Sequence, residues 1–100
     1  MTFVVVATWT ARPGSEAAVE EALRKMIEPS RAEEGCLEYR IQRNLDATNV
    51  FLLYEEYRSP EDYERHLESV HFARNAENDA IPLLESRQRA FIRPLAARRS

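Results

Sequence analysis

Apolar positions along the chain recur with two periods, and the change from one period to the other predicts where strands and helices lie. Residues 3–12 are β-branched and aromatic and stop at Pro13-Gly14, which is typical of a strand that ends in a turn. Ser15 then provides a helix N-cap. The helical spacing that follows is kept by Val19, Ala22, Leu23, Met26 and Ile27. We expect Pro29 to kink this helix and Gly35 to end it as the C′ residue.

The middle of the chain alternates between apolar and polar positions. Residues 36–44 predict a strand with Leu37, Tyr39 and Ile41 on one face. Residues 50–58 predict a second strand, and the turn-forming segment "LDATN" lies between the two. We therefore expect a β-hairpin here.

The last third of the chain predicts one more helical region and one more strand. Ser59-Pro60 begins a helix, because serine caps the first turn and proline fits the first helical position. A second helical segment is expected over about residues 72–84, disturbed by Pro82. Residues 87–95 predict the last strand, which Pro94 ends. The order β-α-β-β-α-β is the ferredoxin-like arrangement of the α+β class.

Residues 1–100 predict a single domain with a core at about 3–94 and a short basic tail at 95–100. The strand at 50–58 is apolar at both parities, and the strand at 3–9 is similar, which is typical of a sheet buried on both faces. Two helical segments on one side cover only one face. We therefore expect a second copy of the chain to cover the other face, in a homodimer joined sheet to sheet.

Composition and charge narrow the classes of partner. The net charge of -3 argues against nucleic acid, which favours a basic protein surface. A single cysteine, Cys36, excludes an intrachain disulfide and a cysteine-based metal site. The opening "MTFVVVATW" is too short to cross a bilayer and lacks the features of a signal peptide, so we expect a cytoplasmic protein without a membrane partner.

The glycine content and the arginines near the C-terminal end indicate which small-molecule ligands the chain could bind. With only Gly14 and Gly35, the chain has no glycine-rich phosphate loop, so a nucleotide cofactor is unsupported. An anionic ligand or simply a solvated strand edge and tail would explain the basic residues near the end, which are Arg87, Arg89, Arg93, Arg98 and Arg99.

The two histidines, His66 and His71, are five positions apart in "HLESVH". On a continuous helix this spacing separates the side chains by roughly 140° around the axis, whereas helical metal pairs use i, i+3 or i, i+4. We therefore predict no metal, since a site would need a helix break at Ser69-Val70 and a carboxylate such as Glu55. His66 suits general acid–base catalysis, with Asp62 one turn earlier to orient its ring. A structural hydrogen bond of His66 to Asp62 or Glu55 is the alternative.

Four segments, "RPG" after the first strand, "EEGCLEY" at 33–39, "FLLYEEYRS" at 51–59 and "HLESVHF" at 66–72, together resemble the antibiotic biosynthesis monooxygenase family. The resemblance spans roughly residues 3–94. It implies a dimeric α+β barrel with a small-molecule cavity between the sheet and the helices of each subunit. The same resemblance implies that one face of the strand at 50–58 points into the cavity, with Phe51, Leu53, Glu55 and Tyr57, and that Tyr39 lies beside them. The other face of this strand would then lie in the dimer interface, with Val50, Leu52, Tyr54 and Glu56.

The sequence also departs from the family pattern. Tyr57 stands where many members have tryptophan, and Leu53 stands where some polyketide-tailoring oxygenases have asparagine. The iron-ligand histidine of the haem-degrading branch corresponds to Ala76, so haem is not expected. The resemblance thus favours the cofactor-independent chemistry of the family, in which a deprotonated quinol itself reduces dioxygen.

The resulting hypothesis is a homodimeric monooxygenase that uses dioxygen and no cofactor on a quinol, phenol or polyketide-like aromatic molecule. We expect His66, Tyr57 and Glu55 to be catalytic. We expect contact with the substrate from Tyr39, His71, Phe51, Leu53 and Trp9. Structural roles remain open for several of them: Glu55 as an ion-pair partner, the tyrosines as core residues, and Trp9 in the dimer contact. Two other functions remain open, an isomerase of a small polar carbonyl compound, such as a phosphorylated sugar derivative, and a non-catalytic ligand-binding dimer.

Overall fold

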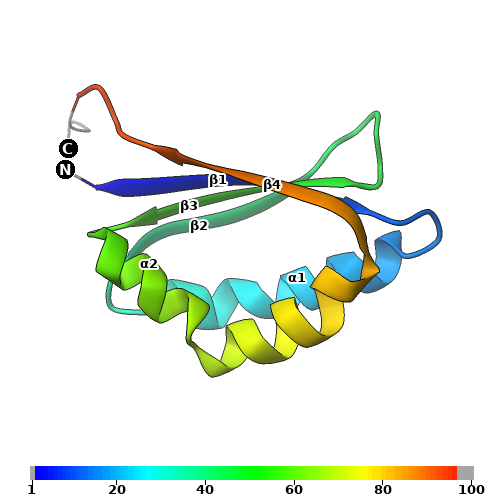
Figure 1. Cartoon of the computed structure of the whole chain (residues 1–100), viewed down its shortest axis with the longest axis horizontal. Coiled ribbons are helices and arrows are strands. Elements are labelled where there is room, and N and C mark those ends of the chain that lie inside the picture. The colour runs from blue at the N-terminus through cyan, green and yellow to red at the C-terminus, as the bar shows by residue number, and fades with distance from the viewer. Residues whose placement is uncertain (1, 97–100) are drawn as a thin grey trace.

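The computed structural model describes residues 2–96, and these follow the predicted order of strands and helices (Figure 1). The elements are β1 (Phe3–Ala11), α1 (Glu16–Arg31), β2 (Cys36–Arg43), β3 (Val50–Tyr57), α2 (Pro60–Leu67), the π-helix η1 (Phe72–Ala80), the 3₁₀ helix η2 (Ile81–Leu83) and β4 (Leu84–Ile92). The ferredoxin-like prediction is therefore confirmed. The basic tail lies outside the described residues from position 97 onward.

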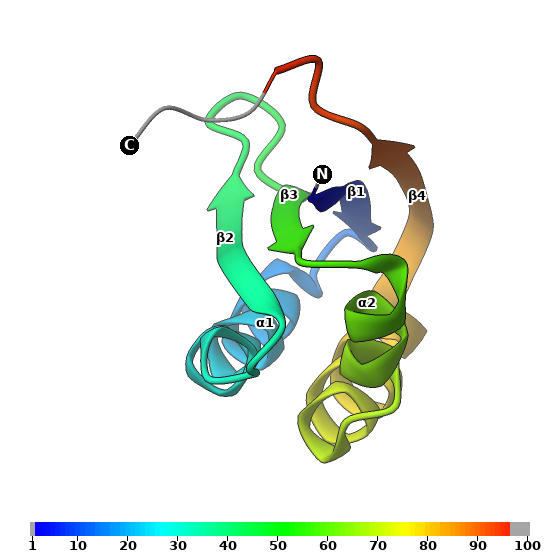
Figure 2. The ribbon, with the colours of Figure 1, turned by 90° about the vertical axis from the view of Figure 1, so that its left-hand side faces the viewer.

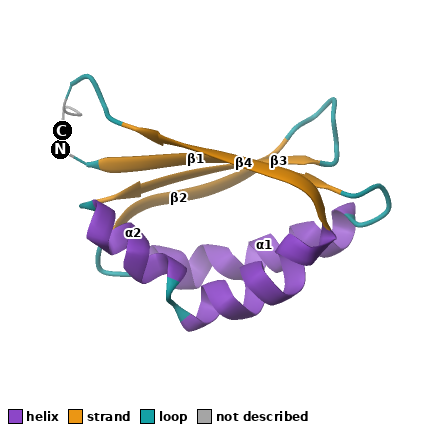
Figure 3. Ribbon diagram, in the orientation of Figure 1, coloured by secondary structure: helices purple, strands orange, loops and turns teal. Residues whose placement is uncertain are grey.

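The four strands form one antiparallel sheet in the order β2-β3-β1-β4, and the helices lie on one face of it (Figure 3). Seen end-on, α1 lies below the β2 side of the sheet and α2 below the β4 side (Figure 2). The opposite face carries no helix in the described part of the chain. Within residues 2–96 no helix combines the length and the apolar character that crossing a bilayer requires.

The two parities of β3 face different environments, as the family resemblance implies. The side chains turned toward the helices, at most 5% exposed, belong to Phe51, Leu53, Glu55 and Tyr57. On the other parity, Leu52 is 41% exposed. The core lies between sheet and helices, where residues of β1 and β3 pack against the apolar face of α1 through Val19, Ala22, Leu23 and Met26. The predicted helical period of α1 is thus confirmed.

The prediction that Leu37 shares a face with Tyr39 and Ile41 is wrong. The register of β2 against β3 shifts between Cys36 and Glu38, which adds one residue to β2 as in a β-bulge. Leu37 is this extra residue and is 51% exposed. Cys36 pairs with Tyr57 instead and packs against the core. Its burial raises the pKa of the Cys36 thiol to about 11, so the thiol is not activated.

The boundaries after α1 and before β4 also differ from the prediction. The helix α1 continues through Pro29 to Arg31, and its C-cap is Ala32. Gly35 is not the C′ residue, since Gly14 is the only residue with positive φ among those described. The strand β4 begins at Leu84, immediately after the short 3₁₀ helix that contains Pro82.

Gly35 is required for a different reason, which is close packing. A Cβ atom at this position would overlap the side chain of Asp62. Asp62 is in turn fixed by Arg58 and Arg65 and by the hydroxyl of Ser59. Gly35 thereby allows the turn before β2 to approach the first turn of α2.

We predict that Gly35→Ala lowers the free energy of unfolding by about 2–3 kcal/mol, because a Cβ must displace a carboxylate held by two arginines. Urea unfolding followed by circular dichroism measures this. The matched control is Glu34→Ala at the neighbouring exposed position, which should stay within about 0.5 kcal/mol of the wild type. Equal costs for the two variants would show that Gly35 is not needed for packing.

Candidate functional site

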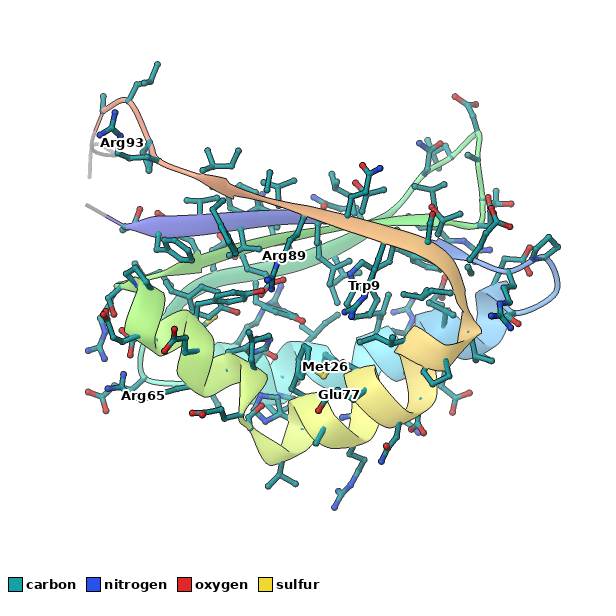
Figure 4. The ribbon with its side chains drawn as sticks, in the orientation of Figure 1. Trp9, Met26, Arg65, Glu77, Arg89 and Arg93 are labelled. Carbon is teal, nitrogen blue, oxygen red and sulfur yellow. The ribbon has the colours of Figure 1, made fainter. Side chains whose placement is uncertain are left out.

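A cavity of about 290 Å³ lies between the sheet and the helices. Its apolar walls come from β1, β3, α1 and η1, and include Trp9, Met26, Leu53 and Phe72. Its polar groups come from β2, β3, α2 and β4. Figure 4 shows Trp9 and Arg89 pointing from the sheet toward the helices, where Met26 lies on α1. The volume is close to the lower end of the range of small-molecule pockets, so the cavity suits a small ligand.

Glu55 is a buried carboxyl group in the wall of this cavity, with an exposed fraction of 5%. The hydroxyl of Tyr57 donates a hydrogen bond of 2.6 Å to Oε1 of Glu55. Nε2 of His66 lies 3.8 Å from the same oxygen, within ion-pair range but beyond a direct hydrogen bond. The geometry thus brings together the three residues that the sequence singled out as catalytic.

Burial controls the protonation of these groups. Loss of solvation raises the pKa of Glu55 above its usual range, against the hydrogen bond from Tyr57 and the attraction of His66, which lower it. Burial and the neighbouring Glu55 raise the pKa of Tyr57, so its phenol stays protonated and acts as a donor. Burial likewise raises the pKa of Tyr39, the next cavity-lining phenol. A carboxyl group with a raised pKa beside an imidazole is a common feature of proton-transfer sites.

Glu33, in the turn between α1 and β2, is a site residue that the sequence did not single out. One of its oxygens, Oε2, lies 2.8 Å from Nδ1 of His66 and 2.5 Å from Nε2 of His71. The expected orientation of His66 by Asp62 is wrong, because Asp62 is engaged by Arg58, Arg65 and Ser59. Sequence alone could not separate Glu33 from Glu34, which is 89% exposed in its side chain and pairs with Arg58.

Four ionisable side chains form a line from the cavity to the surface, in the order Glu55, His66, Glu33 and His71. His66 is buried, with Nε2 toward Glu55 and Nδ1 on Glu33. His71 follows Glu33, is 19% exposed in its side chain and lines a surface hollow with Lys25 and Asn75. The arrangement can carry a proton between the cavity and solvent with one longer gap, the 3.8 Å between His66 and Glu55.

The same cluster is the candidate position for a metal ion. Glu33, His66 and His71 each offer one ligand atom, and these atoms lie within 4.8 Å of one another. The spacing argument that kept the two histidines apart is wrong, because α2 ends at Leu67 and η1 begins at Phe72. The carboxylate that joins them is Glu33 rather than Glu55. That the site works without a metal stays a prediction.

The remaining candidate residues divide into those in the cavity wall and those outside it. Trp9, Tyr39 and Leu53 line the cavity, so the alternative of Trp9 in a dimer contact is not needed to explain its burial. Phe51 lies outside the lining, in the core beneath the guanidinium of Arg43. His71 does not line the cavity, because Glu33 and His66 lie between it and the cavity. Tyr57 does not line the cavity either and contacts it through its hydrogen bond to Glu55.

Sequence analysis missed one cavity residue, Tyr63, and named Arg87 and Arg89 only within a basic group that an anionic ligand or a solvated strand edge would explain. Tyr63, one turn before His66 on α2, lines the cavity, and its side chain lies against His66 and Tyr57. Arg87 and Arg89 line the cavity from β4. The helical spacing i, i+3 between Tyr63 and His66 was the available signal for the first, and the period of two in β4 was the signal for the second.

Comparison with known proteins places this geometry in a family. Residues 2–78 match the family described as "Antibiotic biosynthesis monooxygenase". "Putative monooxygenase Rv0793" of Mycobacterium tuberculosis is 35% identical over 68 residues, which are 68% of this chain and 66% of that protein.

Solved structures agree in fold. The Rv0793 structure has a TM-score of 0.88 at 28% identity and covers 97% of this chain and 98% of that one. PA3566 from Pseudomonas aeruginosa has a TM-score of 0.85 at 34% identity, covering 95% of each chain.

We predict a pH-dependent stability difference between the wild type and Glu55→Gln. Because burial raises the pKa of Glu55, the folded state holds this proton more tightly than the unfolded state, whose pKa is about 4.3. The contribution of the Glu55 proton to wild-type stability is therefore complete below that pH and is lost as the pH rises through the higher folded value. Glutamine at position 55 has no ionisable group, so the variant should gain stability relative to the wild type as the pH rises.

Thermal unfolding between pH 4 and pH 8 measures the difference. Glu56→Gln, at the next position on the opposite face of β3, controls for the loss of one negative charge. A constant difference between wild type and Glu55→Gln across this range would contradict a raised pKa of Glu55.

Proposed function

The chain belongs to the antibiotic biosynthesis monooxygenase family, and we propose that it is a cytoplasmic, cofactor-independent monooxygenase of phenols or quinols. The observation that carries the proposal is the buried pair of Glu55 and His66 in the wall of an apolar cavity. A proton acceptor of this kind can convert a phenol to an electron-rich phenolate in a site that excludes water. The Rv0793 protein, a monooxygenase by name, supports the same reaction class.

The proposed reaction needs no external reductant, since the substrate supplies the electrons. His66 takes the phenol proton through Nε2, and the phenolate transfers electron density to dioxygen so that a carbon–oxygen bond forms at the ring. The protonated His66 returns its proton to the resulting peroxide. The hydrogen on the oxygenated carbon leaves as a proton, the oxygen–oxygen bond breaks, and a quinone and one water are released. One phenol and one dioxygen thus give one quinone and one water.

Glu33 has a positioning role in this scheme. If it accepts the Nδ1 proton of His66, the neutral imidazole keeps its free electron pair on Nε2, which faces the cavity. The negative charge of Glu33 also stabilises the imidazolium that forms during proton transfer. Tyr57 fixes the Glu55 carboxyl group, while Tyr39 and Tyr63 offer phenolic hydroxyls to the substrate from the cavity wall.

Isomerisation of a small carbonyl compound is the second candidate. The observation in its favour is that two proton-transfer groups, Glu55 and His66, lie 3.8 Å apart at one cavity. Such a pair could remove a proton from one carbon and return it to the next without oxygen. The test below separates the two reactions by their oxygen consumption.

We predict that the purified protein consumes oxygen with at least one member of a panel of hydroquinones, above the rate without protein. His66→Asn should lower kcat by roughly 100-fold or more, because it removes the proton acceptor. Glu33→Gln should lower kcat less, because His66 remains as the proton acceptor and loses only the carboxylate that positions its ring. An oxygen electrode and incorporation of ¹⁸O from labelled dioxygen are the measurements.

Glu34→Gln, at the exposed neighbouring position, is the matched control and should leave kcat unchanged. Absence of oxygen uptake with every hydroquinone would remove the monooxygenase proposal. Turnover of a carbonyl substrate without oxygen would favour the isomerase. Binding with no turnover in either assay would favour a non-catalytic binding protein.

We also propose that the chain is a homodimer joined through the helix-free face of the sheet. This proposal is supported by the apolar residues of that face, Val4, Val6, Leu52, Tyr54 and Ile92. Leu52 and Ile92 are among the exposed large apolar side chains of the described residues. Such a cluster is costly in water and stabilising when a second apolar face covers it.

We predict a mass near twice 11.6 kDa by light scattering at micromolar concentration. Leu52→Glu should shift the protein toward the monomer, because it places a charge in the apolar face. Leu45→Glu is the control, since Leu45 is exposed in the turn between β2 and β3. A wild-type mass of one chain would contradict the dimer.

A further inference from the structure

Two arginines of the edge strand β4 form one side of the cavity. In the pairing of β4 with β1, Arg87 lies opposite Trp9 and Arg89 lies opposite Ala7, and all four residues line the cavity. The period of two along the strand therefore places both guanidinium groups on the cavity side. Figure 4 shows the Arg89 side chain extending from β4 toward the helices, whereas Arg93 lies in the loop beyond the end of the strand.

Arg89 is held in place without being neutralised. Its Nη1 donates a hydrogen bond of 2.8 Å to the hydroxyl of Tyr63, and its guanidinium carbon lies 5.0 Å from the ring centre of Phe91. A guanidinium carries five N–H donors, so this bond leaves most of them available. The aromatic contact stabilises a cation and orients the planar group.

Neither cavity arginine forms an ion pair with a carboxylate in the described part of the chain, whereas Arg24, Arg43, Arg58 and Arg65 do. Among the residues that line the cavity, Glu55 is the one carboxyl group, and it is occupied by Tyr57 on the side of His66. The cavity lining thus carries two permanent positive charges, on Arg87 and Arg89, and one carboxyl group, that of Glu55. The cavity as a whole favours a ligand with negative charge.

We propose that the substrate is a single-ring phenol or quinol carrying a carboxylate, and that Arg87 and Arg89 bind this carboxylate. The inference rests on the proposed function for the phenol end of the molecule, which would face His66. The planar fork of an arginine matches a carboxylate with two parallel hydrogen bonds. A cavity of about 290 Å³ agrees with one aromatic ring rather than a fused polyketide.

The test compares two probes that differ only in charge, 2,5-dihydroxybenzoate and 2,5-dihydroxybenzamide. Binding is measured by calorimetry without oxygen, so that no turnover is required. Trp9 is the single tryptophan of the chain and lines the cavity, so the shift of its indole N–H signal in NMR reports that the probe is inside. Arg87→Gln and Arg89→Gln remove one charge each, and Arg93→Gln, one residue beyond the end of β4 and outside the lining, is the control for loss of a positive charge.

We expect the wild type to bind the acid roughly tenfold or more tightly than the amide, as one charge-assisted pair provides. Arg87→Gln and Arg89→Gln should each reduce this preference, with little effect on amide binding, and Arg93→Gln should preserve it. Equal affinity for the two probes in the wild type, or no shift of the Trp9 signal with either probe, would overturn the proposal. If the wild type prefers 2,5-dihydroxybenzoate but takes up no oxygen with any hydroquinone, the carboxylate-binding site would stand and the proposed monooxygenase function would not.

Discussion

The structure depends on the burial of a carboxyl group, Glu55, in an apolar interior. A charged or polar group in such a place is costly unless each of its atoms finds a partner. Tyr57 provides one on the same strand, and His66 approaches the same oxygen from α2. His66 is buried too, and its second nitrogen is satisfied by Glu33 from the turn before β2. The hydrogen bond between Glu33 and His66 and the close-range attraction between His66 and Glu55 thus fix three elements relative to one another, which apolar packing alone would leave free to slide.

The two sides of the cavity are built differently, and the proposed function assigns a separate task to each side. On the side of β3 and α2, aromatic rings enclose His66, with Tyr39, Tyr57 and Phe72 within 5.6 Å between ring centres. His66 is buried there, so its contacts are with protein groups rather than with solvent. On the side of β4, an edge strand with mostly exposed side chains presents Arg87 and Arg89, which keep contact with solvent. In the proposed function, charge recognition therefore lies at the open side and proton transfer at the closed side.

Local patterns predicted most of the fold and only part of the site. The apolar periods identified β1, α1, β2 and β3, because each repeat is a property of a few neighbouring residues. The failures share a different origin, which is contact between distant segments. The need for glycine at position 35 comes from close contact with Asp62, and the exposure of Leu37 comes from a bulge against β3. Neither cause is visible in the neighbouring residues of the sequence. Glu33 was missed for the same reason, since its partners lie 33 and 38 positions away.

The cluster of Glu33, His66 and His71 allows two chemical states that exclude each other. With a proton on Nδ1 of His66 and a hydrogen bond to Glu33, the electron pair on Nε2 faces Glu55 and the cavity, and His66 is a base. With a metal on Nδ1, a neutral imidazole must carry its proton on Nε2. This N–H would then point toward Glu55, in the way that a metal-bound histidine donates its other N–H to a carboxylate. His66 could no longer accept a substrate proton. Cofactor-independent oxygenation by His66 therefore requires the hydrogen-bonded state, and the identity of the atom on Nδ1 determines which chemistry the cavity can perform.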